Sequence, residues 1–149
     1  MGLDVSHNAW SGAYSAFNSL RRTICEAMGG KWPSSFNSDD GFWYWGDGYT
    51  RETHPGLFVF LSHSDCDGEI SPDDCTKVAD DLEALLPRIA ATAEEPALSG
   101  FVMEKNGDGF VGRRTPGHID RAGGYVGATR QFIAGCREAA RLREPLRFF

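Results

Sequence analysis

The stretch LFVFLSHSDCDGEISPDDC, residues 57–75, joins an apolar segment to a polar turn and then to the start of a helix. Residues 57–61 are five consecutive apolar residues with aromatic and β-branched members, which predicts a buried strand. Ser71, followed by a proline and two aspartates, is typical of a helix N-terminus, since it can cap the first turn and the acids favour the dipole. We therefore expect a strand, a polar junction, and a helix over residues 71–91 that Pro87 kinks or ends early.

Helical periodicity predicts one more helix on each side of this stretch. Apolar residues recur at spacings of three and four over residues 8–28 and again over about 127–142. Residues 2–5 read as a short strand or extended entry, and the final EPLRFF as a last short strand. These elements predict a single small α+β domain, residues 1–149, with about three helices packed on a small sheet.

Two segments lack a regular pattern. Residues 31–55 are rich in turn formers and contain the aromatic run FWYWGDGY, which predicts either a hairpin or a surface loop. Residues 96–127 hold ten glycines and prolines and predict a long loop. The four cysteines form no CxxC motif, and Cys25 and Cys136 fall at apolar helical positions, which indicates reduced thiols in the core.

Composition and charge limit the classes of function. The formal net charge is −6, with acidic residues concentrated before position 96 and arginines mostly after 112, which argues against general DNA binding. No apolar run approaches the roughly 20 residues of a membrane span, and the N-terminus lacks the pattern of a secretory signal. We expect a cytoplasmic protein with no membrane partner and an oligomeric state that the sequence leaves open.

The polar turn HSDCDGEI admits two metal sites, both with a poor match. As a calcium loop, Asp65, Asp67 and Asp74 would be ligands around Gly68, but His63 stands where an oxygen ligand belongs. The segment EKNGDGFVGRRT, residues 104–115, repeats this pattern, but Thr115 stands where its last acid belongs. As a zinc site, His63 with two cysteines and His7 matches no established spacing, so the identity of any metal stays unknown.

Three further interpretations of the same turn remain. His63 beside Asp65 and Cys66 could supply a base and a nucleophile for a hydrolase or transferase. A strand-to-helix junction could instead form a pocket, where acids accept hydrogen bonds from ribose or a base edge and arginines pair with phosphate. Finally, Asp65 and Ser71 could only cap turns while His63 satisfies a core hydrogen bond.

Three blocks of the sequence resemble a family of small bacteriophage and prophage proteins. The blocks are GLDVSHNAWSGAYSAFN, HSDCDGEI and TRQFIAGCREAARLREPLRFF, so the resemblance covers both ends and the middle of the chain. It implies a phage accessory protein of the bacterial cytoplasm, in the class that disarms host defences by sequestering or cleaving nucleotide second messengers.

The resemblance and the residues together predict a binding protein without a cofactor, which sequesters a small nucleotide-like ligand. A hydrolase using His63 and His7 is the rival, and a protein-binding inhibitor of a host protein, with the aromatic run as its hot spot, is a third possibility. No catalytic residue is assigned in the leading prediction. Its ligand-binding residues are His63, Ser64, Asp65, Cys66, Glu69, His7, Asn18, Thr129 and Arg130.

Overall fold

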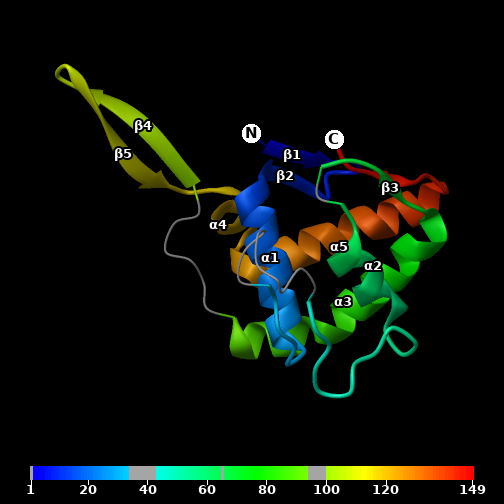
Figure 1. Ribbon diagram of the computed structural model, residues 1–149. Coiled ribbons are helices and arrows are strands. Elements are labelled where there is room, and N and C mark those ends of the chain that lie inside the picture. The colour runs from blue at the N-terminus through cyan, green and yellow to red at the C-terminus, as the bar shows by residue number, and fades with distance from the viewer. Residues whose placement is uncertain (1, 34–42, 65, 94–99) are drawn as a thin grey trace.

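The computed structural model describes residues 2–33, 43–64, 66–93 and 100–149, and it confirms the α+β class (Figure 1). Three long helices and two short ones combine with short antiparallel strands. In chain order the elements are β1 (Gly2–Val5), β2 (Trp10–Ala13), α1 (Tyr14–Ala27), α2 (Pro55–Ser62), β3 (Glu69–Ile70), α3 (Pro72–Thr92), β4 (Gly100–Asn106), β5 (Gly109–Thr115), α4 (His118–Ala122), α5 (Gly124–Leu142) and β6 (Leu146–Arg147). No helix in these described ranges is long and apolar enough to cross a membrane.

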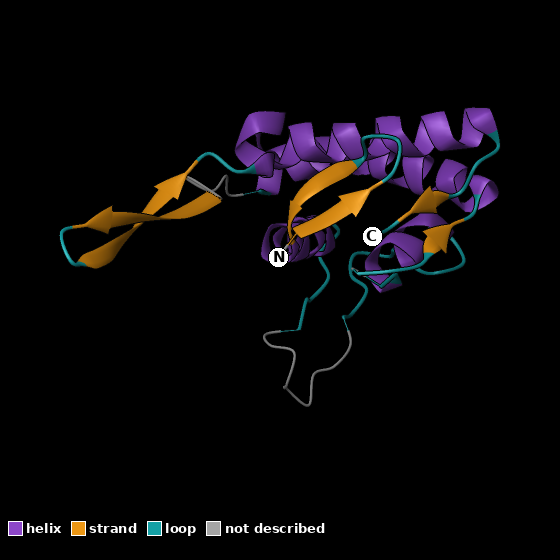
Figure 2. Cartoon of the chain, turned by 90° about the horizontal axis from the view of Figure 1, so that it is seen from above, coloured by secondary structure: helices purple, strands orange, loops and turns teal. Residues whose placement is uncertain are grey.

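The C-terminal segment, residues 146–149, joins two small sheets into one layer. Strand β1 pairs antiparallel with β2, β3 pairs with β6, and a bridge between Val5 and Phe148 connects the two pairs. The amides of Asp4 and Phe149 each donate to the other's carbonyl, at 2.8 and 2.9 Å. The order of strands in the layer is therefore β2, β1, C-terminal segment, β3. One face of the layer packs on the helices, and no helix covers the other face (Figure 2).

An aromatic cluster fills the space between this layer and the helices. Phe17 of α1, Phe60 of α2 and Phe132 of α5 are fully buried and pack with ring centroids 5.0 to 6.1 Å apart. Phe148 from the C-terminal segment lies 6.1 Å from the Phe17 ring. Helices α3 and α5 extend the core away from the cluster through Leu82, Cys136 and their buried neighbours.

The predicted strand over residues 57–61 is wrong, because these residues form most of helix α2. Pro55 occupies the first turn, and the carboxylate of Asp81 in α3 accepts hydrogen bonds from the amides of Gly56 (2.7 Å) and Leu57 (3.1 Å). A run of only apolar residues fits a buried helix as well as a buried strand, since neither periodicity is visible in it. The cap that selects the helix comes from another element.

The predicted start of the first helix at residue 8 is also wrong. Residues 6–9 form the tight turn of the β1–β2 hairpin, in which His7 and Asn8 both have a φ of 57°. Trp10 is buried from strand β2, not from a helix. Its spacing of three and seven residues from Ala13 and Phe17 imitated a helical face.

Two further differences concern proline and glycine. Helix α3 begins after Ser71, whose hydroxyl accepts from the Asp74 amide as predicted, but it continues past Pro87 to Thr92. The predicted loop over residues 96–127 instead contains the β4–β5 ribbon, the short helix α4 and the first turn of α5. The segment NGDG between two runs of β-formers is a hairpin signal that the glycine count concealed.

Part of the irregular segment 31–55 lies outside the described residues, namely residues 34–42. In the described part, Lys31 and Tyr44 exchange backbone hydrogen bonds of 3.0 and 2.8 Å, and residues 47–48 form a turn. Trp43 and Trp45 contact each other edge to face and are half-buried against the core.

Gly56 tests the packing of α2 on α3. A Cβ at this position would overlap the backbone carbonyl of Lys77, and backbone cannot yield as a flexible side chain can. We expect Gly56→Ala to lower the free energy of unfolding by about 2–3 kcal/mol, measured by urea denaturation. Gly109→Ala is the control, since its Cβ would meet only the Asn106 oxygen at 3.9 Å. Equal stability of the two variants would contradict this packing.

Candidate functional site

The imidazole of His63 lies against the C-terminal segment. Its ring packs on Phe148 with centroids 4.3 Å apart, Nδ1 lies 2.6 Å from the Ser64 carbonyl oxygen and Nε2 lies 3.2 Å from that of Glu69. An N–H on either nitrogen therefore meets a backbone acceptor. The ring therefore contacts the backbone at both ends of the turn, at Ser64 and at Glu69.

Arg21 anchors the same turn from helix α1. It is only 6 % exposed, donates from Nη2 to the carbonyl oxygen of His63 at 2.6 Å, and carries its guanidinium 4.7 Å above the Phe17 ring. A buried guanidinium is costly unless hydrogen-bonded, so this contact fixes the turn to α1. No sequence pattern predicted Arg21, because it occupies a position on the apolar face of its helix.

Three predicted residues of the turn face solvent. Ser64 accepts from the Cys66 amide at 3.3 Å, its hydroxyl lies 3.4 Å from the Cys66 sulfur, and Glu69 lies 3.7 Å from Arg147. Asp65 lies outside the described residues. The described side chains of the turn are thus exposed and held by local contacts.

Ser6, His7 and Glu144 form a chain of hydrogen bonds on the other side of the C-terminal segment. The Arg147 amide donates to Ser6 Oγ at 2.8 Å, and Ser6 Oγ lies 2.9 Å from His7 Nδ1, to which the hydroxyl donates when the ring is neutral with its hydrogen on Nε2. Nε2 then carries the remaining hydrogen and donates to Glu144 Oε2 at 2.8 Å. His7 therefore lies between a hydroxyl and a carboxylate, as the histidine of an acyl-transfer triad does, but with the roles of its two ring nitrogens exchanged.

Helix α5 positions this chain of hydrogen bonds. The β1–β2 turn lies so close to α5 that a Cβ at Gly135 would overlap Ala9, and Gln131 donates to the Asn8 carbonyl at 2.9 Å. Non-glycine residues with positive φ are uncommon and are held by their surroundings. The close approach at Gly135 is what allows His7 to reach Glu144.

The remaining predicted residues do not join these contacts. Thr129 is fully buried and donates to the Tyr125 carbonyl within α5 at 2.7 Å, Arg130 is exposed on α5, and Asn18 is half-buried on α1. In the described structure, none of the three shares a hydrogen bond or ion pair with residues 63–69. The structure thus divides the predicted set among at least three places.

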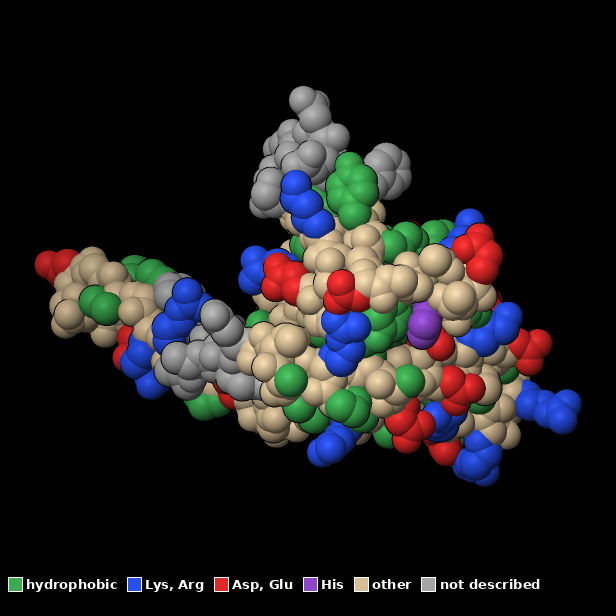
Figure 3. Space-filling view, turned by 90° about the horizontal axis from the view of Figure 1, so that it is seen from below, with side chains coloured by type: hydrophobic (Ala, Val, Ile, Leu, Met, Phe, Trp, Pro, Cys, Tyr) green, Lys and Arg blue, Asp and Glu red, His purple; other side chains and the backbone are tan. Residues whose placement is uncertain are grey.

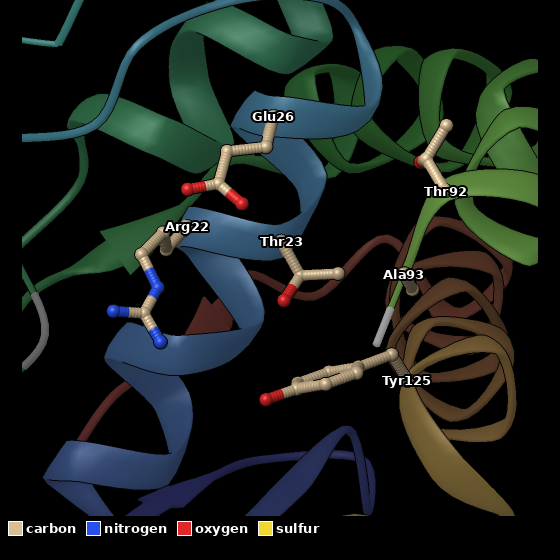
Figure 4. Close-up of a pocket in the computed structure, with 6 residues that line it drawn as sticks. All are labelled: Arg22, Thr23, Glu26, Thr92, Ala93 and Tyr125. Atoms are coloured by element: carbon tan, nitrogen blue, oxygen red, sulfur yellow. The ribbon is translucent and has the colours of Figure 1, made fainter. Parts of the chain in front are cut away.

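A cavity of about 410 Å³ lies between α1, the end of α3 and the start of α5. Figure 4 shows the polar ends of Arg22, Glu26 and Tyr125 gathered around Thr23, with the end of α3 alongside. Arg22 and Glu26 occupy successive turns of α1, and Tyr125 is the second residue of α5. The full lining is Arg22, Thr23, Glu26, Thr92, Ala93 and Tyr125.

Sequence reasoning missed this cavity. Arg22 and Glu26 look like an ordinary solvated pair at i and i+4 on the polar face of an amphipathic helix. In the described structure, however, neither of them has an ion-pair partner. Only the tertiary arrangement shows that both charges border the same hollow.

The thiols and acids supply no metal centre in the described part of the chain, where no three His, Cys, Asp or Glu side chains come together. Cys25 and Cys136 are buried, as predicted, and Cys75 is buried as well. Burial, and secondarily the charge of Glu26, raises the pKa of Cys25 to about 12. Contact with Cys75 and burial raise the pKa of Cys136 above its ordinary value.

His118 lies at the base of the β4–β5 ribbon, with its ring 4.2 Å from that of Trp10. Burial, followed by the nearby charge of Arg121, lowers the pKa of His118 below its ordinary value. His118 Nε2 and Trp10 Nε1 are buried without a hydrogen-bond partner among the described residues. His118 is therefore neutral at physiological pH and serves as a packing group.

Comparison with protein-family models, with curated proteins and with solved structures finds no match to this chain. The resemblance to bacteriophage proteins therefore stays a prediction that depends on the three sequence blocks. The geometry of the site is the basis for the function proposed below.

Cys66 is expected to be the reactive thiol of the folded protein, because it is the exposed cysteine while the other three are buried. With Ellman's reagent at pH 8, we expect one thiol to react quickly in the native protein and four after unfolding in guanidinium. Cys66→Ser should abolish the fast phase without changing the unfolding midpoint. Two fast thiols in the native protein would contradict the burial described here.

Proposed function

We propose that this chain binds a small nucleotide-like anion in the cavity between α1, α3 and α5, and holds it without converting it. The observation that carries the proposal is the cavity itself, in which a cation, an acid, two hydroxyls and a tyrosine surround about 410 Å³. This volume lies within the roughly 300–1,000 Å³ typical of small-molecule sites.

Arg22 supplies the contact for a phosphate. A guanidinium forms bidentate, charge-assisted hydrogen bonds with phosphate oxygens, and this one forms no ion pair with another described residue, although Glu26 lines the same cavity. The cavity also lies at the N-terminal end of the 19-residue helix α5, where the helix dipole favours negative charge. Both features select an anion over a neutral ligand.

Glu26 and Tyr125 supply the contacts for the rest of such a ligand. A carboxylate accepts hydrogen bonds from ribose hydroxyls or from an exocyclic amine, and the hydroxyls of Thr23 and Thr92 can donate or accept. Tyr125 is only 6 % exposed, so its ring is a fixed aromatic wall for a base. None of these residues belongs to the set predicted from the sequence.

We also propose a role in the cell. The three sequence blocks support a phage protein of the bacterial cytoplasm, and a site for a nucleotide-like anion would suit a protein that sequesters a host-defence signalling molecule. A protein of this kind acts by mass action alone, so tight binding without turnover is sufficient.

A hydrolase is the second candidate, and the hydrogen bonds among Ser6, His7 and Glu144 favour it. They present a hydroxyl, a base and an orienting carboxylate in order. His63, the other histidine considered, faces backbone carbonyls with both nitrogens. We rank binding first because Ser6 does not line the described cavity, which lies toward the other end of α5.

The first test is a thermal-shift and calorimetric screen with AMP, ADP-ribose, NAD and cyclic dinucleotides. We expect one of these probes to bind the wild type, and Arg22→Gln or Glu26→Gln to weaken that binding at least tenfold, since hydrogen bonds to charged groups contribute about 1.5–3 kcal/mol. Arg130→Gln is the matched control, because Arg130 is exposed on α5 and outside the cavity lining. Equal loss in Arg130→Gln would reject the cavity as the site.

Chromatography of the released probe separates the two candidates. Recovery of intact probe supports binding. A product whose formation stops in His7→Gln and Ser6→Ala, but persists in Arg22→Gln, would establish the hydrolase instead.

A further inference from the structure

The β4–β5 ribbon stands away from the rest of the molecule. Figures 1 and 2 show it projecting beyond the helices, with neither face packed against them. Four of the seven large hydrophobic side chains that are exposed in the described structure lie on it, namely Val102, Met103, Phe110 and Val111. An isolated two-stranded ribbon is marginally stable in water, so a partner that covers its apolar side chains would stabilise it.

The two faces of the ribbon differ in charge. The register pairs Met103 with Gly112 and Lys105 with Phe110 on one face, where Arg114 also points by alternation. Met103 and Phe110 are 59 % and 67 % exposed, and neither Lys105 nor Arg114 has an ion-pair partner among the described residues. We call these four residues the cationic face.

The opposite face is electrically balanced. It carries Val102 and Val111 together with Glu104 and Arg113, whose side chains form an ion pair of 2.6 Å. Figure 3 shows basic and hydrophobic side chains side by side along the ribbon. The cationic face is therefore the one that fits an acidic partner with an exposed apolar group.

The rest of this chain is acidic and exposes an apolar side chain. The ribbon contributes three basic and two acidic side chains to a total of −6, so the remainder of the chain carries −7. On the uncovered side of the sheet, Phe149 is 66 % exposed and its backbone pairs with that of the exposed Asp4, while Glu69 is exposed on β3 with Arg147 3.7 Å away, so that Asp4 is the acid of this surface without an ion-pair partner among the described residues. A nucleic acid would place its phosphates against this acidic body, which argues against it as the occupant.

We propose that the cationic face of the ribbon docks on the sheet surface around Phe149 of a second copy, and that two copies exchange ribbons reciprocally. Each ribbon points away from the body of its own chain (Figure 2), so the complementary surface belongs to another molecule. Reciprocal exchange closes with two-fold symmetry. Two such contacts, from strands of seven residues, bury on the order of 1,000 Å² in total, which is the lower limit for a specific dimer. This proposal is independent of the ligand site.

Sedimentation equilibrium of the full chain between about 1 and 500 μM, at low and at high salt, tests the proposal. We expect dimerisation in the micromolar range that weakens with salt, because opposite charges meet in the interface. Phe110→Ser and Phe149→Ser should each raise the dissociation constant at least tenfold. Val111→Ser is the matched control on the balanced face and should leave it unchanged. Circular dichroism and melting of each variant verify that it is folded.

A mixing experiment makes the test specific for exchange between ribbon and sheet. Phe110→Ser carries a defective ribbon and an intact sheet surface, and Phe149→Ser the reverse, so their mixture restores one complete contact. We expect the mixture to associate more strongly than either variant alone. A wild type that stays monomeric at 500 μM, an unaffected Phe149→Ser dimer, or equal loss in Val111→Ser would each overturn the proposal.

Discussion

Backbone hydrogen bonds of the last four residues hold the rest of the structure in register. Residues 146–149 pair with β3 on one side and β1 on the other, through Ile70 with Leu146 and through Asp4 with Phe149. Strand β3 has two residues and the β1–β2 hairpin has four per strand, and neither would be stable alone. Insertion of the C-terminal segment turns both pieces into one layer and places Phe148 in the aromatic core.

This insertion also assigns different roles to two histidines that look equivalent in the sequence. His63 packs on Phe148, and both of its ring nitrogens face backbone carbonyl oxygens. Its role is therefore structural, at the polar turn. His7 lies on the other side of the segment, 12 % exposed at the side chain, between a hydroxyl and a carboxylate. The abundance of polar residues in HSDCDGEI is therefore accounted for in part by local structure: a ring that needs acceptors, a buried Arg21, and a serine hydroxyl that accepts from the amide of Cys66.

The predictable parts of the fold are those decided by local sequence. Helices α3 and α5 followed from amphipathic periodicity, and the start of α3 from Ser71 and its neighbours, because capping acts within one turn. Helix α2 did not follow, since LFVFL has no polar face and its cap, Asp81, belongs to α3. The β1–β2 hairpin was not predicted, because Trp10 has a helical spacing to Phe17. Only the packing of Ala9 on Gly135 reveals the turn. The β4–β5 ribbon was not predicted, because its glycines indicated a loop although its side chains alternate as in a strand.

The position of the cavity could not be predicted from the sequence. The sequence pointed to the acids of HSDCDGEI and to Arg130, whereas the cavity of the structure is lined by Arg22, Glu26 and Tyr125, none of which belongs to the predicted set. Helix α5 also explains why the cavity and the hydrogen bonds of Ser6, His7 and Glu144 cannot form one site. Its 19 residues extend about 28 Å at 1.5 Å per residue, with the cavity at its first turn and Glu144 just beyond its last. A small ligand that touches Tyr125 therefore cannot touch His7. Residues near both ends of one helix can belong to a single site only if the ligand is as long as the helix, and this distance separates the binding site from the hydrogen bonds of Ser6, His7 and Glu144.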